Sequence, residues 1–484
     1  MSLSMIYRKF TFVEMRIGIL LLFSLLYLNE IKAQDRPYFH HNERLKLDSQ
    51  SNTLQSFLRK GSFFGHTRFF SMATDNSEGL TDYFAHAIGI GIGYETGKWN
   101  HFTLGISGYA IYDLHSSDFT KLDSSSNQPN RYELGLFDVT NPSNHHDLDR
   151  LEDLYVKYSN SKIDIKFGKQ HIRSPFINPQ DGRMRPTLIQ GLLIDYQLSS
   201  KVLIHFANIQ KLSPRSTIAW YDIAESIGIY GQGVNVNGSK SNYAGQLPNS
   251  EIFYVGTEIK VGKSGKFQLW NQTVTNIFNS ALFQYENSVS MSKSNNFHYG
   301  LQYIRQDAIN DGGNADVTKT YFTKNAKSNV FGLRVGVSQG KAWKFTFNYT
   351  RITKDSRYLM PREWGRDPFF TFMPRERNEG YGDLNAFTAV LSKNLGTDGL
   401  RLDLSYGRFY LPEISNPKLN KYGFPSYEQL NIDLRYSFKG FLKGFDIQGL
   451  YVFKNALSEE QFLPKYEINK VNLNHYNLIL NYHF

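Results

Sequence analysis

Apolar and polar residues alternate with a period of two along most of this chain. The final segment, HYNLILNYHF, shows the pattern clearly, and only Ile479 breaks it. Successive side chains of an extended strand point to opposite faces, so such a segment has one apolar and one polar face. The apolar face of this segment consists of Tyr476, Leu478, Leu480, Tyr482 and Phe484. The pattern predicts β-strands and constrains the fold more than any other feature.

Equivalent runs give about eighteen candidate strands between Lys60 and Phe484, with no convincing amphipathic helix among them. In KAWKFTFNYT, residues 341–350, four aromatic side chains alternate with lysine, threonine and asparagine. A soluble core would need many polar partners to bury both faces of such strands. A lipid environment accepts the apolar face, but it tolerates no open sheet edge, so the strands must close on one another.

The connections between the candidate strands differ in length. Short ones such as 438–445 alternate with long polar ones, including 118–149, 210–250 and 355–383. Short turns at one end and long loops at the other are typical of outer-membrane barrels. We therefore predict an all-β fold, a transmembrane antiparallel β-barrel of about 18 strands with short periplasmic turns and long extracellular loops. A soluble all-β protein with a chance ending is the alternative.

Composition supports this prediction. The 484 residues are 40% hydrophobic, and a mean hydropathy of -0.43 is too polar for a helical membrane protein. The chain nevertheless contains 31 tyrosines and 37 phenylalanines, as expected for aromatic girdles at two membrane interfaces. It has no cysteine, which excludes disulfides, iron-sulfur clusters and thiolate nucleophiles.

The only long apolar run lies near the start, from Ile17 to Leu28, after Arg16 and before the small residue Ala33. It is too short to cross a bilayer comfortably, so we interpret residues 1–33 as a secretory signal peptide. A permanent helical anchor is the alternative. Residues 34–59 then form a short periplasmic segment, and 60–484 form one barrel with an inward-folded loop near 169–190.

The formal net charge is +10. The predicted signal peptide contributes four basic and two acidic residues, which leaves about +8 on the mature chain. This balance indicates anionic partners, among which we expect small solutes and lipopolysaccharide. Because no continuous basic run is present, we expect no nucleic acid. The chain also lacks a phosphate-binding loop, so we expect no cofactor. His145, His146 and Asp147 beside Asp149 could hold a metal, but loop histidines without a defined third ligand rarely do, so we expect no metal site.

One early segment has an unusual second face. In AHAIGIGIGY, residues 85–94, the isoleucines share one face, while Gly89, Gly91 and Gly93 share the other. Glycine inside a strand often marks the close approach of another segment. Some other part of the chain is therefore expected to lie against this wall inside the barrel.

The segment GKQHIRSPFINPQDGRMRPTLIQG, residues 168–191, is too rich in proline, glycine and charge to be a strand. With Gly168, Pro175, Asp181, Arg183, Pro186 and Gly191 it resembles the third-loop region of the OprD-type outer-membrane porins, which are substrate-selective channels of eighteen strands. The segments around 56–70 and 89–113 resemble the first three strands of that family. The resemblance covers most of the mature chain, and this loop is its most specific motif.

The resemblance implies that the loop folds inward and narrows the lumen, and that basic side chains conduct carboxylate-bearing solutes. Arg183 is the best match to the constriction arginine of the family, and Arg185 and Arg173 are weaker matches. Arginine suits this role because its planar, permanently charged group holds a carboxylate with two hydrogen bonds. Alternatively, Arg183 pairs with Asp181 and braces the loop.

Strand alternation adds inward-facing basic candidates: Lys166, Arg334, Lys344, Arg401 and Arg435. Three inward acids, Asp164, Asp403 and Asp433, oppose them, so the wall leans toward anions. Such charges can also be solvated wall residues without a solute. The charged loop around 355–383 contains both signs, and we interpret it as a self-paired lattice packed by aromatic side chains.

The function predicted from these features is passive diffusion of small solutes through a selective outer-membrane porin. The expected solutes are anionic or carboxylate-bearing, such as amino acids, organic acids and short peptides. The terminal strand with Tyr482 and Phe484 resembles the signal that outer-membrane barrels present to their assembly machinery. We do not expect an enzyme. A barrel hydrolase, a weakly selective channel for sugars or peptides, and an adhesin or structural barrel are the alternatives.

Overall fold

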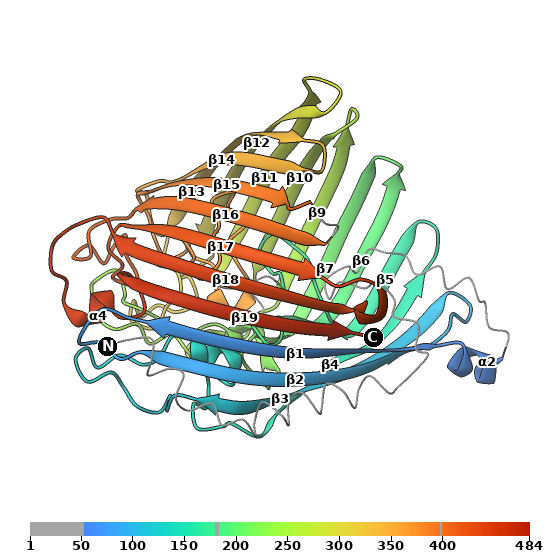
Figure 1. Ribbon diagram of the computed structural model, residues 1–484, viewed down its shortest axis with the longest axis horizontal. Helices are drawn as coiled ribbons and strands as arrows, with labels where there is room; N and C mark the ends of the chain where they lie inside the picture. Colours follow the sequence, from blue (N-terminus) through green and yellow to red (C-terminus); the bar gives the residue numbers. More distant parts are fainter. Residues whose placement is uncertain (1–52, 180–182, 397–398) are drawn as a thin grey trace.

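The computed structural model describes residues 53–179, 183–396 and 399–484, and it confirms the predicted barrel. Eighteen long antiparallel strands form one closed ring, in which β1 pairs with both β2 and β19. The additional strand β8 (Tyr221–Asp222) pairs only with β7. Figure 1 shows the ring from the side, with β1 to β3 and β13 to β19 in front. The predicted signal peptide lies outside the described residues.

The eighteen strands are β1 (Ser62–Asp75), β2 (Tyr83–Glu95), β3 (Phe102–Ser116), β4 (Leu148–Ser159), β5 (Ile163–Gln170), β6 (Leu188–Ser199), β7 (Val202–Ser213), β9 (Ile252–Val261), β10 (Gly265–Val274), β11 (Phe278–Ser290), β12 (Asn295–Ala308), β13 (Lys327–Gln339), β14 (Trp343–Ile352), β15 (Leu384–Asn394), β16 (Leu400–Tyr410), β17 (Tyr427–Ser437), β18 (Phe445–Ala456) and β19 (Leu473–His483). Long loops gather at one end of the barrel, which we call the loop end, and both ends of the described barrel lie at the other, the turn end.

Among the described residues, helical structure is limited to short helices and 3-10 turns outside the wall. The short helices are α2 (Leu54–Arg59), α3 (Ile223–Ser226) and α4 (Pro464–Glu467), with 3-10 turns η2 (Glu133–Leu136), η3 (Arg362–Trp364) and η4 (Gly440–Leu442). Among the residues that the structure describes, no helix combines the length and apolar character needed to cross a bilayer. Helix α2 belongs to the predicted periplasmic segment 34–59, of which residues 34–52 lie outside the described part.

The outward faces of the strands are apolar and end in aromatic side chains. At the turn end Phe445 stacks on Tyr482 with ring centroids 4.2 Å apart, and Phe63 lies 4.7 Å from Tyr94. Near the loop end, outward tyrosines direct their hydroxyls to polar neighbours. For example, the Tyr349 hydroxyl donates to Asn385 Oδ1 at 2.8 Å. The two aromatic levels match the girdles expected at two membrane interfaces.

The ring closes between β1 and β19, a contact that we call the seam. Phe484 donates its N–H to the carbonyl of Gly65 at 3.1 Å and accepts from the Gly65 N–H at 2.9 Å. Gly65 lies on the outward face of β1 and is buried, because the Phe484 ring lies in the space that a side chain would occupy. The terminal aromatic residue therefore fills a gap in the wall at the point where the chain closes on itself.

We predict that Gly65→Leu lowers the temperature at which the folded barrel unfolds in detergent gels. The new side chain would overlap the Phe484 ring, and overpacking of this kind costs about 1–3 kcal/mol. Gly449→Leu on β18 is the matched control, because a Cβ there meets no atom within 4 Å. Equal unfolding temperatures for both variants would contradict the role of Gly65.

Deletion of Phe484 should, in addition, reduce the amount of barrel that reaches the outer membrane.

Candidate functional site

The 171–187 loop enters the barrel because β5 ends early. Lys169 is the last residue of β5 that pairs with β4, and it lies opposite Leu154. The part of β4 before Leu154 therefore has no partner on β5. Gly168, with φ +124°, faces Gly191 across the β5 and β6 pair, and a side chain at either glycine would overlap the backbone of the next strand. Glycine therefore permits the close backbone approach at the point where the loop leaves the wall. The strands extend slightly into both ends of the predicted 168–191 loop.

A β-bulge on β4 creates a charge cluster that the alternation rule misses. Ser107 pairs with Asp153 and Gly108 with Leu151, which leaves Glu152 as the extra residue. Glu152 and Asp153 consequently both lie buried on the inner side, together with Arg150. Arg150 Nη2 lies 2.9 Å from Glu152 Oε1. Two adjacent acids inside an otherwise alternating strand were the available sequence signal for this bulge.

Arg185 fixes the loop to this cluster. Its Nε donates to Glu152 Oε1 at 2.6 Å, and its guanidinium lies 3.9 Å from the ring centre of Tyr109. The Tyr109 ring in turn covers Gly89 and Gly91, where any side chain would collide with it. The glycine wall thus accommodates a tyrosine from β3, and the loop lies against that tyrosine through Arg185.

The other charged residues of the loop have different environments. Arg183 is buried, adopts φ +50°, and accepts a hydrogen bond from Arg68 through its carbonyl oxygen. Arg68 also donates to Asn481 at 2.7 Å, so Arg183 connects the loop to the seam. Among the arginines of this loop that the structure describes, Arg173 is the one whose side chain is exposed. Asp181 lies outside the described residues, so its predicted pairing with Arg183 stays a prediction.

Most of the predicted basic wall residues have a partner. The contacts are Arg334 with Glu286 at 3.0 Å, Arg401 with Asp403 at 2.9 Å, Arg435 with Asp433 at 2.6 Å, and Lys166 with the face of Tyr155 at 3.5 Å. Lys344 is exposed, and it forms no ion pair with any residue in the described ranges. The wall therefore carries less uncompensated positive charge than a count of its inward residues suggests.

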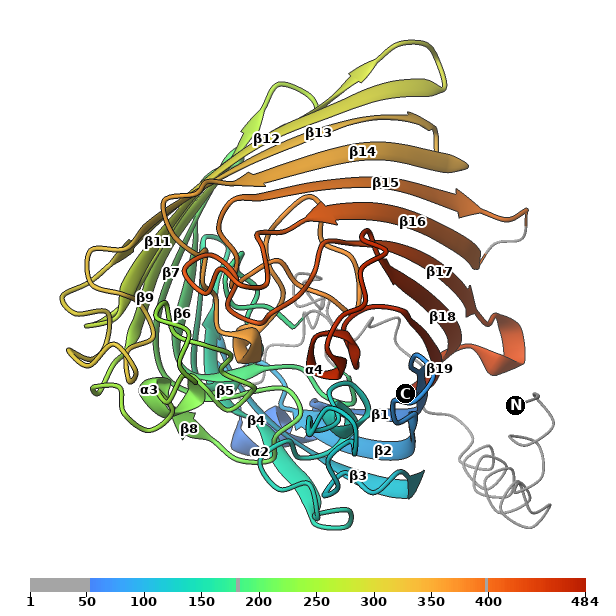
Figure 2. The ribbon, with the colours of Figure 1, turned by 90° about the vertical axis from the view of Figure 1, so that its left-hand side faces the viewer.

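The 353–383 loop also folds into the lumen, where Figure 2 shows loops crossing the interior of the ring as seen from the loop end. Inward side chains on widely separated strands bind its backbone: Gln306 of β12 donates to the Leu359 carbonyl at 2.7 Å, and Gln429 of β17 donates to the Pro374 carbonyl at 2.8 Å. Arg375 Nη2 donates to Asn477 Oδ1 of β19 at 2.8 Å. The loop therefore spans the barrel from β12 to the seam.

The two inward loops contact each other directly. Asn178 donates its side-chain amide to the Arg366 carbonyl at 3.0 Å and its backbone N–H to the Trp364 carbonyl at 3.0 Å. Thr187 donates to the Glu363 carbonyl at 2.6 Å. Gly365, with φ +147°, lies so close to Asn178 that a side chain there would collide with it. Together the 171–187 and 353–383 loops form one body inside the lumen.

Glu376 holds this body to its surroundings. It accepts from Arg131 of the 117–147 loop at 3.0 Å and from Lys454 of β18 at 2.9 Å, and Arg362 lies 3.8 Å away. Burial alone would raise the pKa of this carboxyl group, but the three cations outweigh burial and lower the pKa to about 2. Arg362 also pairs with Glu379, so the loop is partly self-paired as predicted. No pattern in the sequence indicates that a single glutamate joins three segments.

Comparison with known proteins agrees with this architecture. The family model described as outer membrane porin, OprD family, matches residues 57–372. No curated protein matches the chain. Among solved structures, OccAB2 of Acinetobacter baumannii has a TM-score of 0.68 at 15% identity and covers 89% of this chain and 99% of its own. OccK9 (OpdG) of Pseudomonas aeruginosa has a TM-score of 0.67 at 14% identity over 89% of this chain and 99% of its own. At such identities the likeness to these two structures concerns the fold.

We predict that Glu376→Gln increases the single-channel conductance and its noise. The change leaves the buried Lys454 and the half-buried Arg131 and Arg362 without their shared carboxylate. Loss of one partner from a buried ion pair costs about 3–5 kcal/mol. The 353–383 loop should therefore move more freely in the lumen. Glu460→Gln, at an exposed loop position, is the control and should conduct like wild type. Unchanged traces for Glu376→Gln in planar bilayers would show that Glu376 does not hold the loop.

A second prediction concerns Asp367, which is buried in the same loop. Its carboxylate accepts the Asn378 N–H at 2.6 Å, while burial and repulsion by Glu379 raise its pKa from 3.8 to about 6. A raised pKa means that the folded loop favours the protonated form of Asp367. The resulting stabilisation is fully present below pH 3.8 and is lost as the pH rises through about 6. Channel noise should therefore increase between pH 5 and pH 7.5, which are values on either side of about 6.

Asp367→Asn provides the test of this pH dependence. The amide imitates the protonated acid in size and lacks its titration, so noise should become independent of pH in the same range. Glu460→Gln should keep the pH dependence of wild type. If Asp367→Asn keeps it as well, another group controls the loop.

Proposed function

Because the chain belongs to the OprD family of outer-membrane porins, we propose that it is a substrate-selective channel for small anionic or carboxylate-bearing solutes. The barrel is integral to the outer membrane. By the usual orientation of such barrels, its loop end faces the outside and its turn end faces the periplasm. Amino acids, organic acids and short peptides are the solutes proposed, and they would cross by passive diffusion.

The proposal rests on the exposed position of Arg173, on a loop that is bonded to Glu152 and Arg68 of the wall. A fixed guanidinium in a narrow, water-poor passage acts at an effective dielectric constant well below that of bulk water. It can hold a carboxylate with two parallel hydrogen bonds and then release it. Lys344, which is exposed and has no ion pair with any residue that the structure describes, supports the same preference from the wall.

Arg183 and Arg185 have another role in this proposal. Both are buried, and Arg185 is bonded to Glu152, which compensates the charge of Arg185 in part. We assign them to holding the loop in position and assign contact with solute to Arg173. This differs from the expectation that Arg183 contacts solute, which stays a prediction until both positions are tested.

Reversal potentials across a salt gradient test the proposal. We expect Arg173→Glu to shift the potential toward cation selectivity, and to shift it further than Arg183→Glu, because a charge at the exposed position lies closer to the passing ion. Lys393→Glu changes an exposed lysine on the outward face of β15 and should leave the potential unchanged. No shift in either arginine variant would favour a weakly selective channel for sugars or peptides.

Two further partners belong to the proposal. The outward-facing strand end with Tyr482 and Phe484 suits recognition by the barrel assembly machinery, which handles the chain before the seam closes. The outward apolar surface suits contact with outer-membrane lipid and lipopolysaccharide. An energy source should not be needed, because the proposed transport follows the solute gradient.

A further inference from the structure

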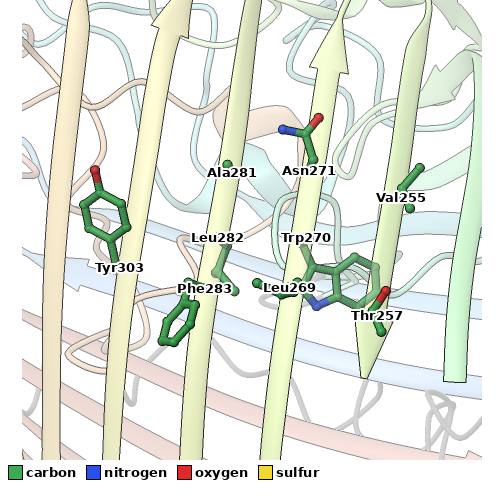
Figure 3. A pocket seen from close by; sticks show the side chains of 9 residues that line it. All are labelled: Val255, Thr257, Leu269, Trp270, Asn271, Ala281, Leu282, Phe283 and Tyr303. Atoms are coloured by element: carbon green, nitrogen blue, oxygen red, sulfur yellow. The ribbon is translucent and has the colours of Figure 1, made fainter. Parts of the chain in front are cut away.

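The inward side chains of the wall differ around the ring. Figure 3 shows β10 and β11, where Leu269 and Phe283 are exposed beside a shallow outward pocket, while Trp270 and Leu282 are buried on the inner side. At the seam the inward positions are polar: His66 and Arg68 of β1, and Asn481 and His483 of β19. Buried polar groups without partners are costly, so hydrogen bonds must satisfy this row.

Asn481 lies at the centre of the polar row. It pairs with Arg68 across the seam, and the neighbouring inward pair, His66 and His483, stacks with ring centres 4.4 Å apart. The Oδ1 atom of Asn481 accepts a hydrogen bond from Arg68 Nε at 2.7 Å and lies 3.2 Å from His66 Nε2. One side-chain oxygen of the last strand therefore orients two side chains of the first strand.

Both of these β1 side chains hold the 171–187 loop. Arg68 donates to the carbonyl oxygen of Arg183, and His66 Nδ1 lies 3.2 Å from Arg185 Nη1. A guanidinium group can only donate, so His66 Nδ1 accepts, and the proton of the neutral ring is on Nε2. His66 donates that proton to Asn481 Oδ1. Two chains of hydrogen bonds thus run from the loop through β1 and meet at Asn481.

The second branch of the Asn481 side chain fixes the direction of its amide. Its Nδ2 donates to Asp446 Oδ1 of β18 at 2.7 Å, while its Oδ1 faces the two donors from β1. Aspartate at this position would place two carboxylates together, and leucine would offer neither a donor nor an acceptor. The site therefore needs an acceptor and a donor on the two branches of one short side chain, which asparagine provides.

We propose that Asn481 is a positioning residue for the 171–187 loop. It holds Arg68 and His66 in the orientation in which they bind the loop. Because Asn481 belongs to the last strand and both of its partners belong to the first, the docking site for the loop is complete only when the seam has closed. The loop therefore takes its place in the lumen after the ring closes. This proposal concerns the position of the loop and does not rest on the solute proposed above.

The accessibility of a thiol on the loop tests the proposal, because the chain has no cysteine of its own. Met184 lies between the two bound arginines and is 1% exposed, so Met184→Cys should react slowly with a charged methanethiosulfonate reagent in the purified full chain. Addition of Asn481→Leu or Asn481→Ala removes the common acceptor of Arg68 and His66. Each should raise the rate of modification about tenfold, equivalent to about 1.4 kcal/mol.

Asn348→Leu is the matched control for the loss of a buried inward asparagine. Asn348 of β14 accepts from Arg334 Nε at 2.8 Å, and its Nδ2 donates to Thr388 of β15 at 3.1 Å, so it also bridges neighbouring strands through both branches. Its partners lie on the wall away from the seam, so Met184→Cys should stay protected in this variant.

A paired exchange tests the donor and acceptor pattern itself. Asp446→Asn together with Asn481→Asp reverses the hydrogen bond between the two positions and keeps an acceptor for Arg68 and His66. The rate of modification should return to that of Met184→Cys alone. Only barrel that migrates as folded in unheated detergent gels is scored, so a poor yield of one variant does not imitate a loss of protection.

Three results would overturn the proposal. The first is an unchanged rate of modification in the folded Asn481→Leu or Asn481→Ala barrel. The second is an equal increase with Asn348→Leu, which would assign the effect to general loosening of the wall. The third is a paired exchange that folds and leaves the thiol as reactive as Asn481→Leu does.

Discussion

The closed ring of backbone hydrogen bonds is the constraint on which the rest of this structure depends. Lipid offers no partner for an unpaired N–H or carbonyl group, so the first and last strands must meet. The seam between β1 and β19 satisfies this requirement over His66 to Asp75 of β1, and Phe484 extends it to Gly65. Without that closure the barrel would have no enclosed lumen, and the inward loops would have no defined position.

A ring of eighteen strands encloses a space too wide for wall side chains to fill, and the loops occupy it. Their backbones need hydrogen-bond partners there, and the inward polar residues of the wall provide them. Gln306, Gln429 and Asn477 therefore act as attachment points for the 353–383 loop. Polar residues that a strand pattern marks only as lumen-facing thus gain a structural role, and some of the charge that looked available to solute serves to hold loops.

The site could be predicted only in part. The inward loop, its arginines and the inward basic residues of the wall follow from composition and alternation. The partners of those charges do not, because they depend on strand register and loop packing. Asp403 and Asp433, for example, compensate Arg401 and Arg435, while Lys344 has no such partner in the described part of the chain. The bulge at Glu152 reversed the expected direction of one side chain and so created a buried acid that binds Arg185.

The alternation along the chain is enough to specify the fold class, because a period of two with aromatic ends shows which face of every strand meets lipid and leaves closure as the only solution. It also identified the terminal Phe484 and the glycines at 89 and 91 as special positions. What those positions accommodate depends on the packing of distant segments: Gly65 receives the terminal ring, and Tyr109 covers Gly89 and Gly91. The same holds for the contacts of Glu376 with Arg131, Arg362 and Lys454. Such contacts join residues far apart in the chain, and local periodicity carries no information about which of them will meet.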